Sequence, residues 1–358
     1  MRRRDGNPRN WSRTIIALVA AAAIMFGLTG CGVFASGGRS EKTSERVVKD
    51  IDDAEVRVPE KPSRVVALSE PTLDAALALG VTPVGTVSGR GQNSVPGYLA
   101  EKAKDIPLVG GIGDLDYEKI SSLKPDLIIV DGTSVNNRPD VLEILRQIAP
   151  LVFCGYAGGP WELNFDTTAR ALNLETKGEE VKTAFRDKIE QGKARLAPIY
   201  GDKTFSIVRW QGSGPSLILK ELPAGQVLEG LGLKRPQSQD REGRGHSDPV
   251  SLENLSTIDA DYMFFGTLGG ASQANPHSDS TADREGAAQA LTTAEETSGF
   301  TDLSAYKNHH IITVDGSRWT STGGPLLLNG IVDDILAELP RAKQPAGALD
   351  RFRHLSCQ

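Results

Sequence analysis

The sequence is poor in the residues that build metal centres. Its 358 residues include three Cys and five His. The histidines show neither the HExxH pattern nor another paired spacing typical of zinc ligands. His309 and His310 open an expected strand, where adjacent side chains point to opposite faces. We therefore predict that the protein holds no metal ion of its own and no other cofactor.

Two glycine-rich segments fall short of known catalytic motifs. Gly110–Gly113 does not complete the GxGxxG pattern of dinucleotide-binding loops, and no suitable helix follows it. Gly245–Ser247 matches part of a nucleophile elbow, but Pro249 stands where the closing glycine is required, and no expected strand precedes it. The sequence therefore predicts a protein that is not an enzyme.

Outside its first residues the chain has no block of Lys and Arg. The formal net charge of the whole chain is -6. Residues 1–30 hold five Arg and one Asp, so the remaining residues carry a net charge of -10. An acidic body without a basic cluster disfavours binding to nucleic acid and electrostatic binding to membrane surfaces. We therefore expect no nucleic-acid partner.

The N-terminal segment has the order of a bacterial export signal. Five arginines precede the apolar run Ile15–Leu28, which is too short to span a membrane. The run ends in Leu28-Thr29-Gly30-Cys31, which resembles the lipobox of bacterial lipoproteins. This resemblance implies that residues 1–30 are a signal peptide and that Cys31 carries a lipid, which anchors the protein to the cell membrane outside the cytoplasm. The alternative is an ordinary secretory peptide with a cysteine nearby by chance.

The pairing of the other two cysteines is left open by the sequence. Cys154 and Cys357 form an even pair in an exported protein, and they are candidates for a disulfide that ties the C-terminal tail to the first lobe. Alternatively, Cys154 ends an apolar run and is simply a buried thiol.

One phrase occurs twice in the chain. YEKISSLKPDLIIV at Tyr117–Val130 aligns with LENLSTIDADYMFF at Leu252–Phe265 without a gap. Each copy has the pattern of a short amphipathic helix, a polar break and a strand that is apolar on both sides, which is typical of a buried strand in a parallel sheet. The duplication predicts two lobes of similar build with a cleft between them. The polar positions that it aligns are Glu118 with Glu253 and Asp126 with Asp261.

The remaining pattern predicts an α/β fold with a helical connector. Strand and helix signals alternate through residues 46–176, which indicates a parallel sheet flanked by helices. Strong helix formers predominate in Glu179–Leu196, so we predict a connecting helix over residues 177–198. Strand signals resume in residues 199–358, whereas the Gly- and Ser-rich residues 31–45 are expected to form a flexible tether. A helix bends little, so two Rossmann-like lobes joined by one long rigid α-helix should close only slightly on a ligand in the cleft between them.

Several motifs together resemble the ABC-transporter substrate-binding proteins of the iron–siderophore and cobalamin class, the class III periplasmic binding proteins. The resemblance covers nearly all of the chain after the signal segment. It implies a ligand cleft between two lobes and a monomeric binding protein whose partner is an ABC permease dimer in the membrane. The segments that carry it are Arg64–Thr86, Leu115–Gly132, Glu179–Leu196, Val250–Phe265 and Ile311–Pro325.

The resemblance also gives a role to the two aligned glutamates. In this family one glutamate on each lobe docks into a basic pocket of a permease subunit, and those positions match Glu118 and Glu253. A two-lobed protein that meets a two-fold partner needs one matching charge on each lobe, and exposed carboxylates steer encounter and register. The alternative is that both are solvated residues favoured by the helix dipole in a first turn.

Ligands of parallel α/β sheets bind beyond the carboxyl ends of the strands. Guanidinium groups there can hydrogen-bond the oxygens of a ferric complex, and aromatic rings can cover its organic arms. Arg209 and Trp319 are favoured because both end strands of the second lobe, whereas Trp210 alternates with Arg209, so only one of that pair is expected to face the ligand. Each candidate also has a purely structural alternative, an ion pair or a core contact. The candidate ligand-binding residues are Arg90, Tyr156, Trp161, Arg209, Trp210, Arg318 and Trp319.

The resemblance and the candidate residues together predict an extracytoplasmic protein that captures a ferric siderophore, with the hydroxamate type favoured, and delivers it to an ABC permease. Alternative ligands within the same class are cobalamin and haem, for which Tyr156 or His246 is a candidate axial ligand. A further alternative is an envelope interaction protein that uses the fold without a ligand.

Overall fold

The computed structural model describes residues 44–135, 138–212, 214–270 and 281–339. The expected signal peptide, the lipidation site Cys31, nearly all of the expected tether and the second candidate disulfide cysteine, Cys357, lie outside these residues. None of the helices within the described ranges is both long and apolar enough to cross a membrane.

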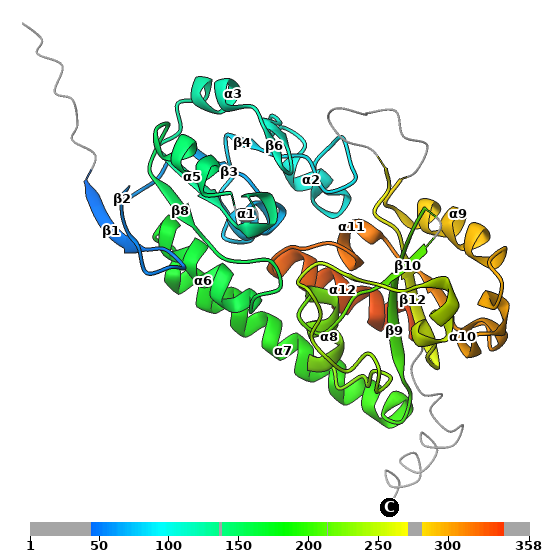
Figure 1. Cartoon of the computed structure of the whole chain (residues 1–358). Coiled ribbons are helices and arrows are strands. Elements are labelled where there is room, and N and C mark those ends of the chain that lie inside the picture. Colours follow the sequence, from blue (N-terminus) through cyan, green and yellow to red (C-terminus); the bar gives the residue numbers. More distant parts are fainter. Residues whose placement is uncertain (1–43, 136–137, 213, 271–280, 340–358) are drawn as a thin grey trace, which may run out of the picture. The chain divides into compact units, whose positions relative to one another are not determined.

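A parallel sheet forms the centre of the first lobe (Figure 1). Its strand order is β4-β3-β7-β8, and every neighbouring pair is parallel. All four residues of β7 are buried, because helices cover both faces of the sheet. The strands are β3 (Val65–Ala67), β4 (Gly85–Thr86), β7 (Leu127–Val130) and β8 (Leu151–Phe153).

Alternating strand residues divide between the two helical layers of this lobe. Ile129 belongs to a hydrophobic cluster with α1 (Glu70–Ala78) and α6 (Trp161–Leu172). Ile128 belongs to a second cluster with α3 (Tyr117–Ser122) and α5 (Pro139–Arg146). The smaller elements of the lobe are the antiparallel hairpin β1 (Glu45–Lys49) and β2 (Glu55–Pro59), the pair β5 (Gly110–Gly111) and β6 (Asp114–Leu115), the 3₁₀ turn η1 (Gly97–Leu99), α2 (Ala100–Ala103) and α4 (Gly132–Val135).

The second lobe contains a mixed sheet of order β11-β10-β9-β12-β13. Strands β9, β12 and β13 are parallel as expected, but β10 runs antiparallel to β9 and β11 antiparallel to β10. The reversal follows from chain length, because β10 begins three residues after β9 ends and a parallel crossover needs about a dozen residues. The strands are β9 (Phe205–Gln211), β10 (Gly214–Leu217), β11 (Asp248–Pro249), β12 (Tyr262–Gly266) and β13 (Ile311–Thr313).

Helices and 3₁₀ turns connect these strands. The second copy of the repeated phrase differs from the first, because its helical part is the 3₁₀ element η2, in which Asn254 departs from helical backbone angles. The elements that join the strands of the second lobe are α8 (Pro223–Gly230), η2 (Leu252–Ile258), α9 (Arg284–Glu295), η3 (Phe300–Asp302) and α10 (Ser304–Lys307), and α11 (Gly316–Trp319) follows the last strand.

The repeated aspartate has the same structural task in both lobes. The Asp126 carboxylate accepts hydrogen bonds from the backbone N–H groups of Ser63 (2.8 Å) and Arg64 (2.9 Å), just before β3. The Asp261 carboxylate accepts the backbone N–H of Thr204 (2.8 Å), just before β9. In each lobe the aspartate just before the strand of the repeated phrase, β7 or β12, therefore fixes the start of the neighbouring parallel strand, β3 or β9. This shared contact is a physical reason for an aspartate at the same position of both copies.

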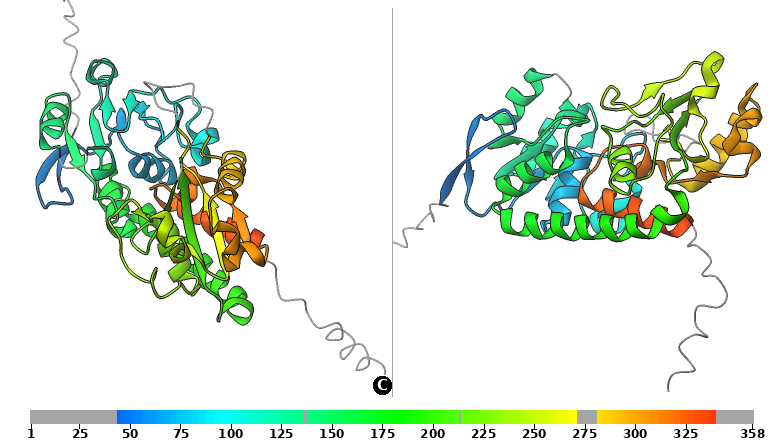
Figure 2. Two further views of the ribbon diagram at one scale, coloured as in Figure 1. Left: turned by 45° about the vertical axis from the view of Figure 1, so that its right-hand side comes forward. Right: turned by 90° about the horizontal axis from the view of Figure 1, so that it is seen from below.

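Two long helices join the lobes. Helix α7 (Glu175–Tyr200) has 26 residues and is longer than the connector that the sequence predicted. Helix α12 (Pro325–Glu338) lies beside it (Figure 2). A single hydrophobic cluster continues from Leu73 and Phe165 of the first lobe to Phe264 of the second. The prediction of two lobes joined by a long helix is confirmed. Helix α12 is a second helical brace, since it packs against α1 of the first lobe, α8 of the second lobe and the connector α7.

Candidate functional site

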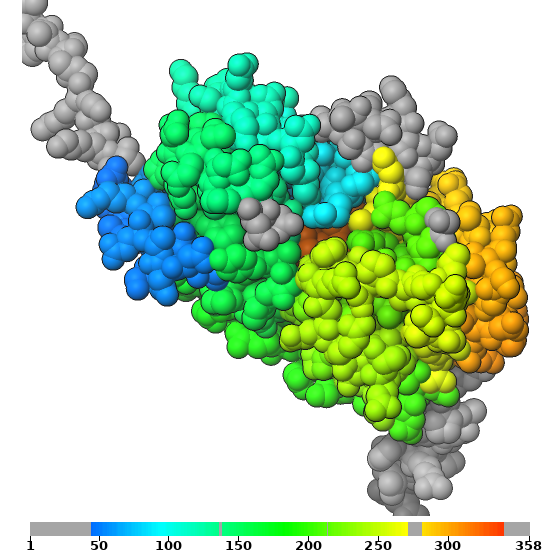
Figure 3. Space-filling view, in the orientation of Figure 1, coloured from blue at the N-terminus to red at the C-terminus, as the bar shows by residue number. Residues whose placement is uncertain are grey.

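A cavity of about 300 Å³ lies between the two lobes. In the space-filling view a hollow separates the first lobe from the segment around residue 245, and the orange-red C-terminal part of the chain is visible at its base (Figure 3). Its lining combines two arginines with amide, imidazole and hydroxyl groups. The lining residues are Arg90, Thr133, Ala157, Arg209, Gln211, Gly245, His246, Leu268, Thr320, Ser321 and Thr322.

The cavity lies where the strands end. Thr133 and Ala157 follow β7 and β8, Arg209 lies near the end of β9, and Leu268 follows β12. Because parallel strands of one sheet finish at the same edge, segments far apart in the sequence meet there. The expectation of a cleft at the carboxyl ends of both sheets is met.

Two arginines from different lobes face this cavity. Arg90 donates from Nη2 to the Thr133 carbonyl (3.2 Å). Arg209 donates from Nη1 to the Thr320 carbonyl (3.3 Å) and from Nη2 to the Ser247 hydroxyl. Within the described ranges, neither guanidinium forms an ion pair with a carboxylate. Burial, together with repulsion from Arg90, lowers the pKa of Arg209 to about 10. Among the described residues, the lining of the cavity therefore carries two guanidinium groups and no carboxylate.

A buried carboxylate lies behind Arg90. Glu70, only 1% exposed, accepts the backbone N–H of Arg90 through Oε1 (2.8 Å). Its Oε2 accepts the hydroxyls of Ser321 (2.9 Å) and Thr322 (3.3 Å) from the second lobe. Burial raises the pKa of Glu70, while attraction to Arg90 opposes the rise.

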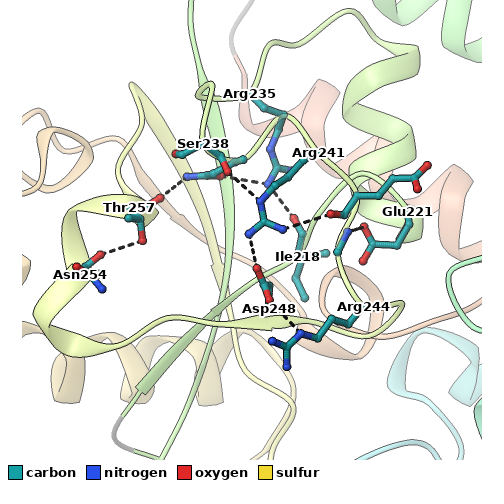
Figure 4. Close-up of polar contacts among 12 residues, drawn as sticks. Ile218, Glu221, Arg235, Ser238, Arg241, Arg244, Asp248, Asn254 and Thr257 are labelled. Atoms are coloured by element: carbon teal, nitrogen blue, oxygen red, sulfur yellow. Dashed lines mark hydrogen bonds and ion pairs between the residues drawn. The ribbon is translucent and has the colours of Figure 1, made fainter.

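An arginine-rich loop forms one wall of the cavity. Figure 4 shows Asp248 between Arg241 and Arg244, and both guanidinium groups contact its carboxylate. Glu221 accepts the backbone N–H groups of Gly243 (2.8 Å) and Gly245 (3.2 Å). These contacts hold the loop in the conformation that presents His246 and the neighbouring residues to the cavity.

The two lobes touch beside the cavity through glycine. Gly158 (φ +74°) and Gly245 (φ +83°) both have left-handed backbones, and a Cβ on Gly158 would lie 2.6 Å from the Cα of Gly245. A side chain at either position would separate the lobes, so this contact requires glycine.

A smaller space of about 30 Å³ lies beside the cavity and shares Thr133, Ala157 and Thr322 with its lining. This volume suits about one water molecule. Asp131 and Cys154 line it, and one carboxylate oxygen of Asp131, Oδ2, is buried without a hydrogen-bond partner among the described residues. Burial raises the pKa of the Cys154 thiol to about 12, which leaves it unreactive. The predicted disulfide with Cys357 stays a prediction.

Of the candidate ligand-binding residues, Arg90 and Arg209 line the cavity. Tyr156 borders the smaller space, but its hydroxyl donates to Asp52 and its ring packs edge-on against Phe153 at 5.2 Å. Its side chain is therefore half exposed and directed towards the first lobe's own surface.

The structure corrects the placement of the three tryptophans. Trp319 is fully buried, stacks on Phe264 at 4.2 Å and donates from Nε1 to Asp334 (2.8 Å), because the turn α11 carries it inwards. Trp210 is 1% exposed and faces the opposite side of β9 from Arg209. Of these two neighbours, Arg209 is therefore the one that faces the cavity. Trp161 touches the smaller space, but its ring packs into the core against Phe185 at 5.2 Å.

Arg318 is also placed away from the cavity. Its guanidinium forms an ion pair with Asp334 (2.9 Å) on α12. The structural alternative, an arginine near a strand end that pairs with a carboxylate, therefore describes this residue.

Sequence reasoning missed the hydroxyl groups of Thr320–Thr322 and the role of Glu70. Glu70 follows β3, and Thr320–Thr322 lie beyond the end of β13, so the rule that ligands bind beyond the carboxyl ends of strands also selects these residues. Small hydroxyls and an acid in a first helical turn are common, however, and they give no distinct signal in one sequence.

Glu118 and Glu253, the expected docking residues, are both exposed. Glu118 lies in the first turn of α3 and Glu253 in the first turn of η2. Their role in docking stays a prediction. No cluster of three or more Asp, Glu, His or Cys side chains suited to a metal ion occurs in the part of the chain that the structure describes.

Comparisons with known proteins agree with this architecture. Residues 65–317 match a family model described as periplasmic binding protein. A Bacillus subtilis (strain 168) protein named "Probable siderophore-binding lipoprotein YfiY" is 31% identical over 315 residues, which cover 86% of this chain and 92% of that protein. The Fe(3+)-citrate-binding protein YfmC of the same organism is 31% identical over 265 residues, which cover 72% of this chain and 80% of the relative.

Solved structures show the same fold. The crystal structure of Staphylococcus aureus SirA complexed with staphyloferrin B has a TM-score of 0.69 and 25% identity, and it covers 84% of this chain and 100% of SirA. Petrobactin-binding protein YclQ from Bacillus subtilis has a TM-score of 0.65 at 20% identity, which compares the fold alone. With two lobes, a long connecting helix and a family match over most of its length, this chain belongs to the periplasmic binding protein family.

Proposed function

We propose that this protein captures a small, negatively charged ferric siderophore complex outside the cytoplasm and delivers it to an ABC permease. The observation that carries the proposal is the pair Arg90 and Arg209, which face one cavity of about 300 Å³ from two lobes, and among the described residues neither guanidinium forms an ion pair with a carboxylate. Two such cations repel each other, and an anion between them removes the repulsion. The binding site is therefore incomplete until an anionic ligand enters.

The donors in the cavity suit the oxygen shell of a ferric complex. Guanidinium groups can donate two parallel hydrogen bonds to a carboxylate, and they do so without displacing it from iron. The hydroxyls of Thr320–Thr322 and the amide of Gln211 add weaker donors around the same space. Iron is in this view the cargo of the protein, held by the siderophore rather than by protein side chains.

The cavity favours a carboxylate ligand over the hydroxamate type expected from sequence. A ferric complex of three hydroxamates is neutral, so it leaves the repulsion between the arginines in place. The indole rings expected to cover organic arms lie in the protein core, and a volume of about 300 Å³ is at the small end for ligand sites. One relative supports this choice, since it is named as Fe(3+)-citrate-binding.

Anchoring and delivery are parts of the same proposal. The lipobox-like segment that ends in Cys31 would hold the protein at the membrane, and the name of one relative includes lipoprotein. Glu118 and Glu253 would dock one lobe each onto the two permease subunits, with the binding protein acting as a monomer.

A titration of the purified protein tests the proposal. Ferric citrate is expected to bind and raise the melting temperature, whereas ferrichrome, a neutral ferric hydroxamate, should bind less well. Haem and cobalamin serve as the competing ligands, because His246 at the cavity is a candidate axial ligand for haem. Binding of haem or cobalamin with no response to any ferric complex would overturn the proposal. Absence of any ligand would favour an envelope interaction protein.

A further inference from the structure

Helix α1 carries two buried carboxylates on the face that meets the second lobe. Glu70 and Asp74 are four residues apart, so they lie on the same side of the helix. Their exposed fractions are 1% and 0%. Each accepts hydrogen bonds from the segment Ser321–Leu327, which belongs to the second lobe.

The contacts of Glu70 connect separate walls of the cavity. Its Oε1 accepts the backbone N–H of Arg90 (2.8 Å), and its Oε2 accepts the hydroxyls of Ser321 (2.9 Å) and Thr322 (3.3 Å). All three partners line the cavity of about 300 Å³. One buried carboxylate therefore contacts residues of both lobes that line the cavity.

Asp74 supports the same arrangement one helical turn further on. Its carboxylate accepts the backbone N–H groups of Leu326 and Leu327, both at 2.9 Å, at the start of α12, and the hydroxyl of Tyr98 at 3.0 Å. A Cβ on Gly324 would lie 2.8 Å from Asp74 Oδ1, so the close approach of the chain requires glycine there. The segment that carries Ser321 and Thr322 is thus fixed at its other end.

We propose that Glu70, supported by Asp74, is a positioning residue for ligand binding: it presets the distance between Arg90 and the hydroxyls of the second lobe, and it offsets part of the cavity's positive charge. This inference rests on the proposed function, because it concerns the same cavity and an anionic ligand.

The charge of Glu70 has a distinct consequence for selectivity. The Glu70 carboxylate attracts the charge of Arg90, whereas the partners of the Arg209 guanidinium among the described residues are a hydroxyl and a carbonyl. Removing the Glu70 charge while keeping its shape leaves two uncompensated cations in the cavity. Affinity for an anionic complex should then rise, whereas affinity for a neutral complex should not change.

Two substitutions separate the positioning role of the Glu70 side chain from the effect of its charge. In Glu70→Gln the amide oxygen can still accept the Arg90 N–H, and the amide NH₂ can donate to the hydroxyls of Ser321 and Thr322, which then accept. Glu70→Ala removes these ties altogether. Glu101→Ala, at an exposed position of α2, is the matched control.

The experiment measures affinity for ferric citrate and for ferrichrome at pH 8, and hydrogen exchange of the segment Ser321–Leu327 in ligand-free protein. Glu70→Gln is expected to bind ferric citrate about tenfold more tightly and ferrichrome unchanged, with exchange like that of the parent protein. Glu70→Ala should accelerate exchange in this segment and weaken both complexes about tenfold. The control should change none of these quantities.

Two kinds of outcome overturn the inference. Exchange in Glu70→Ala that is as slow as in the parent protein removes the positioning role. If Glu70→Gln changes the affinities for ferric citrate and ferrichrome equally, or changes neither, the proposed effect of the Glu70 charge is wrong. If the parent protein binds neither complex, the proposed function fails by itself, and the exchange measurement still decides whether Glu70 positions the second-lobe segment.

Discussion

Asp74 and Arg195 bind opposite ends of the same helix. Asp74 accepts the N–H groups of Leu326 and Leu327 at the start of α12, whereas Arg195 donates to the carbonyls of Leu336 (2.6 Å) and Leu339 (3.4 Å) at its end. An anion at the N-terminus and a cation at the C-terminus both match the helix dipole. Because Asp74 comes from α1 and Arg195 from α7, helix α12 is fixed to the first lobe and to the connector at once.

Replacing Arg195 with Ala should therefore lower the free energy of unfolding by about 1–2 kcal/mol, the loss expected for a charge-assisted cap. Urea unfolding measures the change. Arg186→Ala, also on α7, is the control, since the Arg186 side chain is 62% exposed and makes a surface ion pair. Equal effects of the two substitutions would contradict the bracing role.

Ligand binding should change the radius of gyration only slightly. The physical reason is that α7 and α12 lie side by side and a continuous hydrophobic cluster joins the lobes, so a large hinge motion would expose buried apolar surface. Small-angle scattering with and without ferric citrate measures this. A large compaction on binding would show that the two braces do not restrain the lobes.

Asp131→Asn should stabilise the protein at pH 8. Burial raises the pKa of Asp131 from 3.8 to about 6, so the native state holds the proton more readily than the unfolded chain does. The stabilising effect of that proton is present below pH 3.8 and is lost as the pH rises through about 6. The neutral asparagine removes this cost, which amounts to at most about 3 kcal/mol for a shift of roughly two units.

Urea unfolding at pH 8, 6 and 4 measures the difference between Asp131→Asn and the parent protein, with the exposed Asp105→Asn as control. The gain should shrink as the pH falls and vanish near pH 4. A gain that is independent of pH would show that packing, rather than ionisation, is responsible.

Arg209 and Trp319 should behave differently although the sequence favoured both as ligand contacts. Arg209→Ala should weaken ferric citrate binding by about 1–3 kcal/mol, because a charged donor is lost from a partly desolvated cavity. Trp319→Phe should leave affinity unchanged and lower the free energy of unfolding by about 1 kcal/mol, since the bond from Nε1 to Asp334 is lost. Calorimetric titration and urea unfolding separate the two effects, and Arg209→Lys tests whether charge alone suffices. A lower affinity of Trp319→Phe for ferric citrate would show that Trp319 contributes to ligand binding.

Reversing the charge of Glu118 or Glu253 should abolish uptake and leave ligand affinity intact. Both carboxylates are exposed, and like charge facing a basic pocket would prevent docking. Transport of radiolabelled ferric complex into cells that depend on this protein measures uptake, and titration of the purified variants measures affinity. Uptake at the parental rate would contradict the docking role, and reduced affinity would place these residues elsewhere in the mechanism.

Local pattern was enough for the elements and their order. The apolar run of β7 predicted a strand buried on both faces, and the helix formers of Glu179–Leu196 predicted the connector, because both signals depend on neighbours in the sequence. The repeat predicted two lobes, and the alternation of Arg209 with Trp210 predicted that only one of them faces the cleft. Strand ends then indicated which loops meet there.

Tertiary structure alone decided which side chains enter the cavity. Trp319 and Arg318 follow a strand as predicted, yet the turn α11 directs both towards Asp334, and no local pattern encodes that distant partner. The contact of Glu70 with Ser321 joins residues 251 positions apart, and Asp74 meets the start of α12 over a similar separation. A single sequence records the composition of each segment, whereas the pairing of segments depends on how the two lobes pack. The cavity between the lobes exists only after that packing.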